Sequence, residues 1–205
     1  MPYILRPMEP SDVPVVAAID RLSFPTPWPP AAFQRELKRK RAHYYVLLRP
    51  KGEGSPVPDR GWVDRFRQLV SPARRTRIIG YVGFRVQGDE GHITTIAVHP
   101  DWRGKGFGDL LLVVALDEML DRGMDAVTLE MRPSNEVAYQ LYTKYGFEVE
   151  RRRRRYYQDG EDAWVMAADV SNEGYRQQLA QRRQELTQRL RGERIKVGQK
   201  AGAPL

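Results

Sequence analysis

Ile96-Ala-Val-His-Pro-Asp-Trp-Arg-Gly-Lys-Gly-Phe-Gly108 joins an apolar strand to an apolar helix and decides the fold. Its glycines, at positions 104, 106 and 108, let the backbone approach a ligand closely. The helix that follows begins with backbone amides that have no partner within the helix, so the loop is a natural cradle for an anion. A glycine-rich turn without a ligand explains this segment alone equally well.

Two other phosphate-binding motifs do not fit the segment. A P-loop requires Gly-Lys followed by Ser or Thr, with four residues between its glycines. A dinucleotide-binding fingerprint requires Gly-x-Gly-x-x-Gly, whereas the glycines here are evenly spaced and several elements precede them. Both alternatives are therefore disfavoured.

Strands and helices are expected on both sides of this stretch. Apolar patterns bounded by turn residues indicate strands at about 4–6, 44–48, 78–86, 92–98, 126–131, 147–152 and 163–170. Helices are indicated after Ser11-Asp12 and over about 31–40, 108–122 and 135–145. This order predicts an α/β fold over residues 1–170, with a mixed central sheet flanked by helices.

Two basic segments depart from this pattern. Residues 50–77 contain seven basic and three acidic residues and residues 171–205 contain eight and three, which leaves a net charge of −1 elsewhere within the total of +8. Apolar residues from Trp62 to Val70 have helical spacing, and Tyr175, Leu179, Leu186 and Leu190 form one narrow stripe. We expect a basic insertion and a helical tail, which contact RNA or a ribosome through counterion release or are simply solvated.

Composition excludes several kinds of site. The chain has no Cys, which rules out disulfides, thiolate metal sites and an acyl-Cys intermediate within it. His43, His92 and His99 lack metal-ligand spacing, so we interpret them as structural or surface residues and expect no metal. No apolar leader and no run of eighteen apolar residues occur, which predicts a cytoplasmic protein without a membrane span.

The stretch 96–108 resembles the acyl-CoA signature of the GCN5-related N-acetyltransferases (GNAT), Arg/Gln-x-x-Gly-x-Gly/Ala after a strand. Three further segments are similar to the branch that acetylates protein N-termini, which includes the ribosomal-protein-alanine acetyltransferases: Leu129-Glu-Met-Arg-Pro-Ser-Asn135, Leu141-Tyr-Thr-Lys-Tyr-Gly-Phe147 and Tyr156-Tyr-Gln-Asp-Gly-Glu-Asp-Ala-Trp164. The resemblance covers about 4–170. It implies a GNAT-like fold and transfer of an acetyl group from acetyl-CoA, the cosubstrate, to an amine.

The resemblance also implies which residues bind acetyl-CoA. The backbone of Ile96 and Val98 would pair with the pantetheine arm, and Asn135 would contact the cosubstrate. The pyrophosphate would lie on Arg103, Gly104, Lys105, Gly106, Phe107 and Gly108. Physical reasoning agrees, because neighbouring parallel strands that splay apart leave edge groups to which pantetheine amides can bind like a short added strand.

Glu130 and Tyr142 are the candidate catalytic residues. Glu130 alternates with the apolar set Val127, Leu129 and Met131, so it lies on the opposite face of its strand, where an ordinary solvent-facing Glu is the alternative. The matching family position faces the site, which implies a general base. Tyr142 is either a packed aromatic residue or, as the resemblance implies, a general acid, since a phenol with a pKa of ~10 can protonate a thiolate with a pKa of ~8.5.

The acceptor is expected to be an α-amine. Neutralising an α-amine with a pKa of ~8 costs about 1.4 kcal/mol near pH 7, whereas a Lys amine with a pKa of ~10.4 costs about 4.6 kcal/mol. Direct attack of this amine on the thioester is the economical mechanism, because no Cys is available. The resemblance nominates Phe24, Pro25, Trp28, Tyr156 and Tyr157 as walls of a site for a peptide N-terminus, including that of a ribosomal protein, although core packing explains each of them too.

Two other functions remain open at this stage. An acetyltransferase of a small amine, an antibiotic or a Lys side chain would keep the same cosubstrate site. A non-enzymatic module that senses acyl-CoA and binds RNA or a ribosome would use the basic segments. Intact Glu130 and Tyr142 count weakly against the second.

Overall fold

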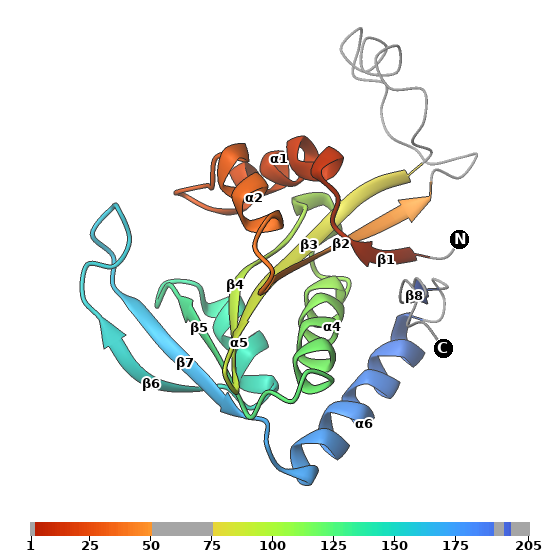
Figure 1. Cartoon of the computed structure of the whole chain (residues 1–205), viewed down its shortest axis with the longest axis vertical. Coiled ribbons are helices and arrows are strands. Elements are labelled where there is room, and N and C mark those ends of the chain that lie inside the picture. The colour runs from red at the N-terminus through yellow and green to blue at the C-terminus, as the bar shows by residue number, and fades with distance from the viewer. Residues whose placement is uncertain (1–2, 51–75, 191–194, 198–205) are drawn as a thin grey trace, which may run out of the picture.

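A computed structural model describes residues 3–50, 76–190 and 195–197 (Figure 1). The strands are β1 (Tyr3–Pro7), β2 (Ala42–Pro50), β3 (Thr76–Gln87), β4 (Glu90–Val98), β5 (Ala126–Met131), β6 (Glu148–Arg153), β7 (Ala163–Asp169) and β8 (Ile195–Val197). The helices are α1 (Val13–Ser23), α2 (Pro30–Leu37), α4 (Phe107–Leu120), α5 (Glu136–Lys144) and α6 (Glu173–Leu190), with 3-10 turns η1 (Pro10–Asp12) and η2 (Pro100–Trp102). The helix expected at 62–70 lies outside the described residues. Among those described, no helix is long and apolar enough to span a membrane.

One mixed sheet organises the molecule, in the order β6-β7-β5-β4-β3-β2-β1-β8. Neighbouring strands are antiparallel except for the parallel pairs β4–β5 and β1–β8. The predicted α/β fold with a helix-flanked mixed sheet is confirmed. β8 was not expected, because it comes from the tail.

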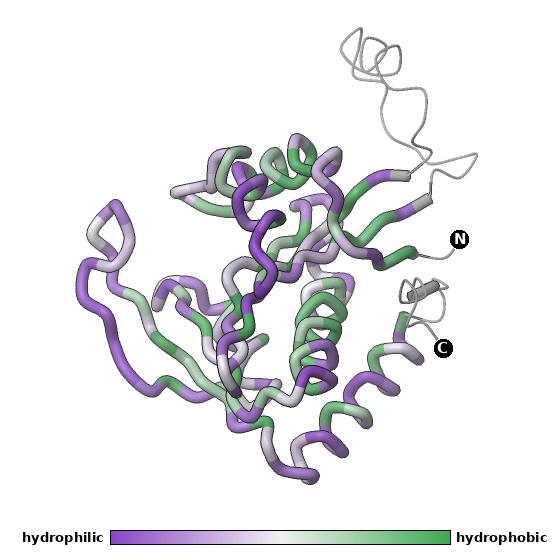
Figure 2. Tube along the Cα trace, viewed as in Figure 1, coloured by the Kyte–Doolittle hydropathy of each residue, from purple (hydrophilic) through white to green (hydrophobic). Residues whose placement is uncertain are grey.

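Helices cover both faces of the sheet. On one face, α1 and α2, including the buried Phe33 of α2, pack with buried side chains of β2 and β3 such as Val46 and Tyr81. On the other face, α4 lies over β3 and β4, and α6 lies over α4 (Figure 1). α4 is therefore buried between the sheet and α6, which explains why it is apolar nearly all round (Figure 2).

The apolar stripe predicted in the tail is confirmed. Leu179, Leu186 and Leu190 are buried, and the half-buried Tyr175 packs against the same core. The burial of each leucine contributes about 1.5–3 kcal/mol before the entropic cost of ordering the helix. α6 is thus a docked layer of the protein, and its C-terminal end lies beside the N-terminus of α4.

The parallel strands β4 and β5 separate part of the way along their length. Their pairing runs from Glu90↔Ala126 to Ile93↔Leu129 and then stops, although β4 continues to Val98. Thr94 is an extra residue at this point, since the β3–β4 register shifts between Gly83 and Phe84. The splayed strands expected from the sequence are therefore present, and the edge of β4 from Thr94 onward has no partner in β5.

Candidate active site

The loop 103–108, hereafter the cofactor loop, presents backbone amides without acceptors. Gly104 and Gly106 have φ values of +75° and +88°, a region that favours glycine. Within the described ranges, the amides of residues 104–109 donate no hydrogen bond, and the first backbone bond of α4 runs from Leu110 N to the Gly106 carbonyl oxygen at 3.1 Å. Consecutive free amides at a helix N-terminus suit an anion.

The side chains of the cofactor loop are engaged elsewhere. Arg103 Nε donates to the Val98 carbonyl oxygen at 3.1 Å and its Nη2 donates to Ser23 Oγ at 3.0 Å. Lys105 Nζ lies 4.7 Å from the centre of the Trp102 ring, and Phe107 is buried with its ring 4.7 Å from that of Tyr3. For Lys105 and Phe107 the predicted contact with pyrophosphate thus rests on the backbone, whereas the Arg103 amide donates to the Pro100 carbonyl oxygen at 3.2 Å.

The edge of β4 beyond its pairing with β5 carries Ile96 and Val98, and the Val98 carbonyl oxygen also accepts from Arg103 Nε. His99 N donates to the Ile79 carbonyl oxygen at 2.8 Å, and Ala97 is paired with Tyr81. Because hydrogen-bonded and non-hydrogen-bonded pairs alternate between antiparallel strands, Ile96 and Val98 direct their backbone groups away from β3. That direction is the gap left by β5, as a strand-like ligand requires.

Asn135 begins α5. Its Oδ1 accepts a hydrogen bond from Ala138 N at 3.1 Å, so it acts as the N-cap of that helix. The side-chain amide nitrogen is left as the group that could contact acetyl-CoA.

Glu130 lies on the sheet face opposite α4, as the alternation predicted, and its side chain is 13% exposed. Its Oε1 accepts from Arg153 Nη1 at 2.7 Å, and its Oε2 lies 3.1 Å from His92 Nε2. The hydrogen bond from His92, more than the positive charges of Arg153 and Arg151, holds the pKa of Glu130 below its usual range. The carboxylate is therefore kept ionised.

The hydrogen bonds also fix the role of His92. Thr128 Oγ donates to Glu90 Oε1 at 2.7 Å and lies 2.9 Å from His92 Nδ1. The other ring nitrogen faces the Glu130 carboxylate, which only accepts. In this arrangement His92 Nε2 is the donor to Glu130. We call Glu130, His92, Thr128 and Arg153 the Glu130 cluster.

Tyr142 lies on α5 in the core and is 6% exposed, with its ring 5.8 Å from that of Phe147. Burial, followed by the nearby Tyr157, raises the pKa of its hydroxyl. Burial likewise raises the pKa of Tyr157 to about 12, and Glu130 contributes to that shift. Tyr157 thus interacts electrostatically with both candidate catalytic residues.

The predicted peptide walls come from two loops. Asp20 accepts from Trp28 N at 2.6 Å and from the buried Tyr81 hydroxyl, which anchors the α1–α2 loop. The Trp28 ring packs 5.5 Å from Phe33, so part of its surface serves the core. Phe24 is also half-buried and packs against the same apolar core as Phe33, whereas Pro25 is exposed.

The second loop joins β6 to β7 and carries Tyr156 and Tyr157, whose rings meet edge-on at 5.2 Å. Tyr156 is 46% exposed and receives the Arg153 guanidinium 5.5 Å above its ring. The α1–α2 loop lies at the same end of the sheet, because Ser23 bonds Arg103 just after β4. The two loops thus flank the end at which β4 and β5 separate.

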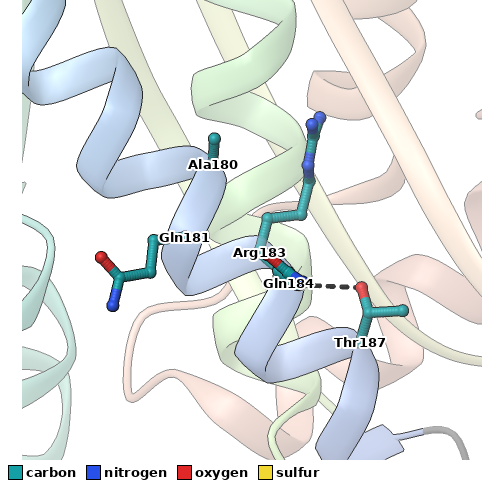
Figure 3. A pocket seen from close by; sticks show the side chains of 5 residues that line it. All are labelled: Ala180, Gln181, Arg183, Gln184 and Thr187. Atoms are coloured by element: carbon teal, nitrogen blue, oxygen red, sulfur yellow. Dashed lines mark hydrogen bonds between the residues drawn. The ribbon is translucent and has the colours of Figure 1, made fainter.

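Other candidates lie away from this end of the sheet. Figure 3 shows a surface hollow lined by residues of α6 only: Ala180, Gln181, Arg183, Gln184 and Thr187. Its walls are one face of a single helix, and Thr187 Oγ donates to the Arg183 carbonyl oxygen at 2.8 Å. In the described ranges there is no group of three or more His, Asp or Glu side chains placed to hold a metal ion.

Sequence reasoning missed three members of the Glu130 cluster. His92 was interpreted as a structural or surface residue, and neither Thr128 nor Arg153 was named as a site residue. Arg153 contacts Glu130, whereas Arg152 pairs with Asp162. Their roles depend on the β4–β5 and β6–β7 registers, and no local pattern specifies these.

Comparison with known proteins identifies the family. The model of the acetyltransferase (GNAT) family matches residues 14–147. The chain is 32% identical over 172 residues to an N-alpha-acetyltransferase of Sulfurisphaera tokodaii, covering 82% of this chain and 93% of the relative. The crystal structure of the ribosomal-protein-S18-alanine N-acetyltransferase from Escherichia coli is similar with a TM-score of 0.65 and 27% identity, over 84% of this chain and 96% of that one.

A second solved structure, Arabidopsis thaliana NAA60 in complex with acetyl-CoA, shares the fold with a TM-score of 0.65 and 18% identity, over 83% of this chain and 99% of that one. The family match spans the splayed strands, the cofactor loop, Glu130 and Tyr142. The chain therefore belongs to the acetyltransferase (GNAT) family and is an N-acetyltransferase.

Proposed function

We propose that this enzyme transfers the acetyl group of acetyl-CoA to the free α-amine of a protein N-terminus. The observation that carries the proposal is the cofactor loop, whose unpartnered amides adjoin a free strand edge that leads toward Glu130. Relatives named for acetylating N-terminal amines support the choice of acceptor. A ribosomal protein is the corresponding candidate substrate.

The residues present fit acetyl-CoA. The amides of 104–109 would hold the pyrophosphate, and the outward backbone of Ile96 and Val98 would pair with the pantetheine amides. When bound, acetyl-CoA supplies the acetyl group as a thioester. The remaining chemistry falls to the protein: to orient an amine, accept its proton and protonate the departing sulfur.

Glu130 is proposed to accept the amine proton through a water molecule. Its lowered pKa makes it a weak base but keeps it ionised, which suits an acceptor that loses its proton for about 1.4 kcal/mol near pH 7. The nitrogen lone pair forms the new C–N bond at the thioester carbon and the C–S bond breaks. The proton released by the amine passes to Glu130.

Tyr142 is proposed to protonate the departing sulfur. Burial raises its pKa, so the hydroxyl is protonated throughout the working pH range. It makes no hydrogen bond within the described part of the chain, which leaves its proton available for a ligand. Because a raised pKa makes a weaker acid, its main contribution is a hydrogen bond to sulfur as negative charge develops there.

The acceptor and the role of Tyr142 are tested together by following CoA release with a panel of acceptors. The panel contains peptides with free Ala and Ser N-termini, N-blocked Lys peptides and small amines. We expect turnover on free N-termini and a loss of about 10²-fold or more in kcat for Tyr142→Phe. Tyr139→Phe, a half-exposed tyrosine on the same helix, is the matched control. CoA binding without turnover of any peptide would overturn the proposal.

Some expectations stay predictions. They are the division near residue 170, the cytoplasmic location and contact with RNA or a ribosome. Of the insertion predicted at 50–77, residues 51–75 lie outside the described residues. In α6, Arg183 and Arg189 pair with Asp117 and Asp109 of α4, so part of the tail's basic charge is already compensated.

A further inference from the structure

α6 brings one arginine to the cofactor loop. Arg189 is in the last turn of this helix, and its side chain is 56% exposed. A Cβ added to Gly106 would lie 2.5 Å from Arg189 Nη2 and 3.2 Å from Cζ, so the guanidinium rests directly on the middle glycine of the loop. Gly106 is also the N-cap residue of α4. A cation from outside the family-matched segment therefore adjoins the predicted pyrophosphate site.

The loop does not supply such a cation itself. Arg103 is held by Val98 and Ser23, and Lys105 lies over the Trp102 ring. Free amides alone would have to offset the negative charge of a pyrophosphate. Arg189 is placed to share that charge, and a guanidinium can donate two parallel hydrogen bonds to phosphate oxygens.

The acidic neighbour of Arg189 does not use up its donors. Asp109 Oδ1 accepts from Lys144 Nζ and from the Tyr145 hydroxyl at 3.2 Å. Arg189 Nη2 is 3.7 Å from the other carboxylate oxygen, beyond hydrogen-bond distance. Its guanidinium makes no hydrogen bond within the described ranges. Asp109 thus orients the guanidinium while leaving its N–H groups for an anion.

We propose that Arg189 binds the pyrophosphate of CoA, so that the docked helix α6 completes the cosubstrate site. The proposal rests on the proposed use of acetyl-CoA and adds a residue to that site. The leucines that bury α6 against α4 then have a functional consequence, because they fix the position of the arginine. Arg189 would contact the pyrophosphate and not the reacting thioester carbon. Its loss should therefore weaken cosubstrate binding and leave the rate of the chemical step unchanged.

The test is calorimetric titration of the full chain with CoA and with dephospho-CoA, which lacks the 3′-phosphate and keeps the pyrophosphate. For Arg189→Ala we expect Kd to rise about tenfold with both ligands, and for Arg189→Lys to rise less. Arg183→Ala is the matched control, because Arg183 pairs with Asp117 at 3.0 Å on the same two helices, farther from the loop. Its Kd should equal that of the wild type. In steady state, Arg189→Ala should raise KM for acetyl-CoA with little change in kcat.

Thermal unfolding without ligand separates binding from folding. If Arg189→Ala unfolds at a lower temperature than the wild type, Arg189→Gln, which preserves more of the side chain, replaces it in the titrations. Equal affinity of wild type and variant, or tighter binding by the variant, would overturn the proposal, since the latter would mean that Arg189 obstructs the loop. A loss confined to CoA would assign the contact to the 3′-phosphate and overturn the pyrophosphate assignment. Wild-type protein that binds no CoA would instead remove the proposed function itself.

Discussion

The cofactor loop and the Glu130 cluster are built by opposite means. In the loop, backbone amides have no partners and the side chains point elsewhere. In the cluster, side chains carry the chemistry, and each is held by another: Arg153 and His92 on Glu130, and Thr128 on His92. The loop is organised to receive a ligand's charge, whereas the cluster is organised to keep its own charge in one state.

The largest expected effect comes from removing the charge of the cluster. Glu130→Gln keeps the shape of the side chain but abolishes its capacity to take up a proton. We expect kcat/KM to fall about 10²- to 10⁴-fold with CoA affinity unchanged. Steady-state kinetics with a free-N-terminus peptide measure the first quantity and calorimetry the second. Glu148→Gln, an exposed carboxylate on β6, is the control. A fall of less than tenfold would exclude Glu130 as the base.

Gly106→Ala alters the cofactor loop and leaves the Glu130 cluster unchanged. Gly106→Ala forces a side chain into a left-handed conformation, costing about 1–2 kcal/mol, and into the Arg189 guanidinium. We expect CoA Kd to rise about tenfold or more, while kcat at saturating acetyl-CoA is nearly retained.

Gly104→Ala separates backbone strain from the contact with Arg189. Gly104 has a similar φ of +75°, but nothing lies within 4 Å of an added Cβ. It should therefore report the backbone strain alone and weaken CoA binding less than Gly106→Ala does. Equal effects of the two variants would contradict the contact between Gly106 and Arg189.

The smallest expected effect is a shift along the pH axis. With Glu130 as the proposed base, activity requires its ionised form and is lost as the pH falls through the pKa of Glu130, which His92 lowers more than any other neighbour. His92→Ala raises that pKa, so the acid limb of the kcat/KM profile should move to higher pH. His43→Ala, whose ring packs 5.2 Å from Phe84 instead, should leave the limb in place. An unmoved limb in His92→Ala would show that His92 does not set the charge of Glu130.

The difference between the cofactor loop and the Glu130 cluster also explains what the sequence could predict. Glycine spacing and strand alternation are local, so the position of the loop, the strand β5 and the face of Glu130 were predicted correctly. His92 meets Glu130 only because β4 and β5 pair in one particular register, with His92 opposite Thr128. A single sequence does not encode that register in any short pattern.

Local cap signals were also incomplete. Ser11-Asp12 was expected to supply N-cap oxygens, yet Asp12 makes no cap bond to α1. Its buried carboxylate instead accepts from Glu9 N at 2.8 Å and from both guanidinium nitrogens of Arg6 at 2.7 and 2.9 Å. The tail shows the same limit, because its apolar stripe was visible but the position of Arg189 over Gly106 follows from how α6 docks.

The central claim is that the acceptor is an α-amine, and one peptide can test it. We would incubate the enzyme with acetyl-CoA and a peptide that has a free N-terminal Ala and an internal Lys, and locate the acetyl group by fragment mass spectrometry. We predict acetylation of the α-amine alone, slowed about 10²-fold or more by Glu130→Gln. Acetylation of the Lys side chain, with the α-amine left free, would contradict it.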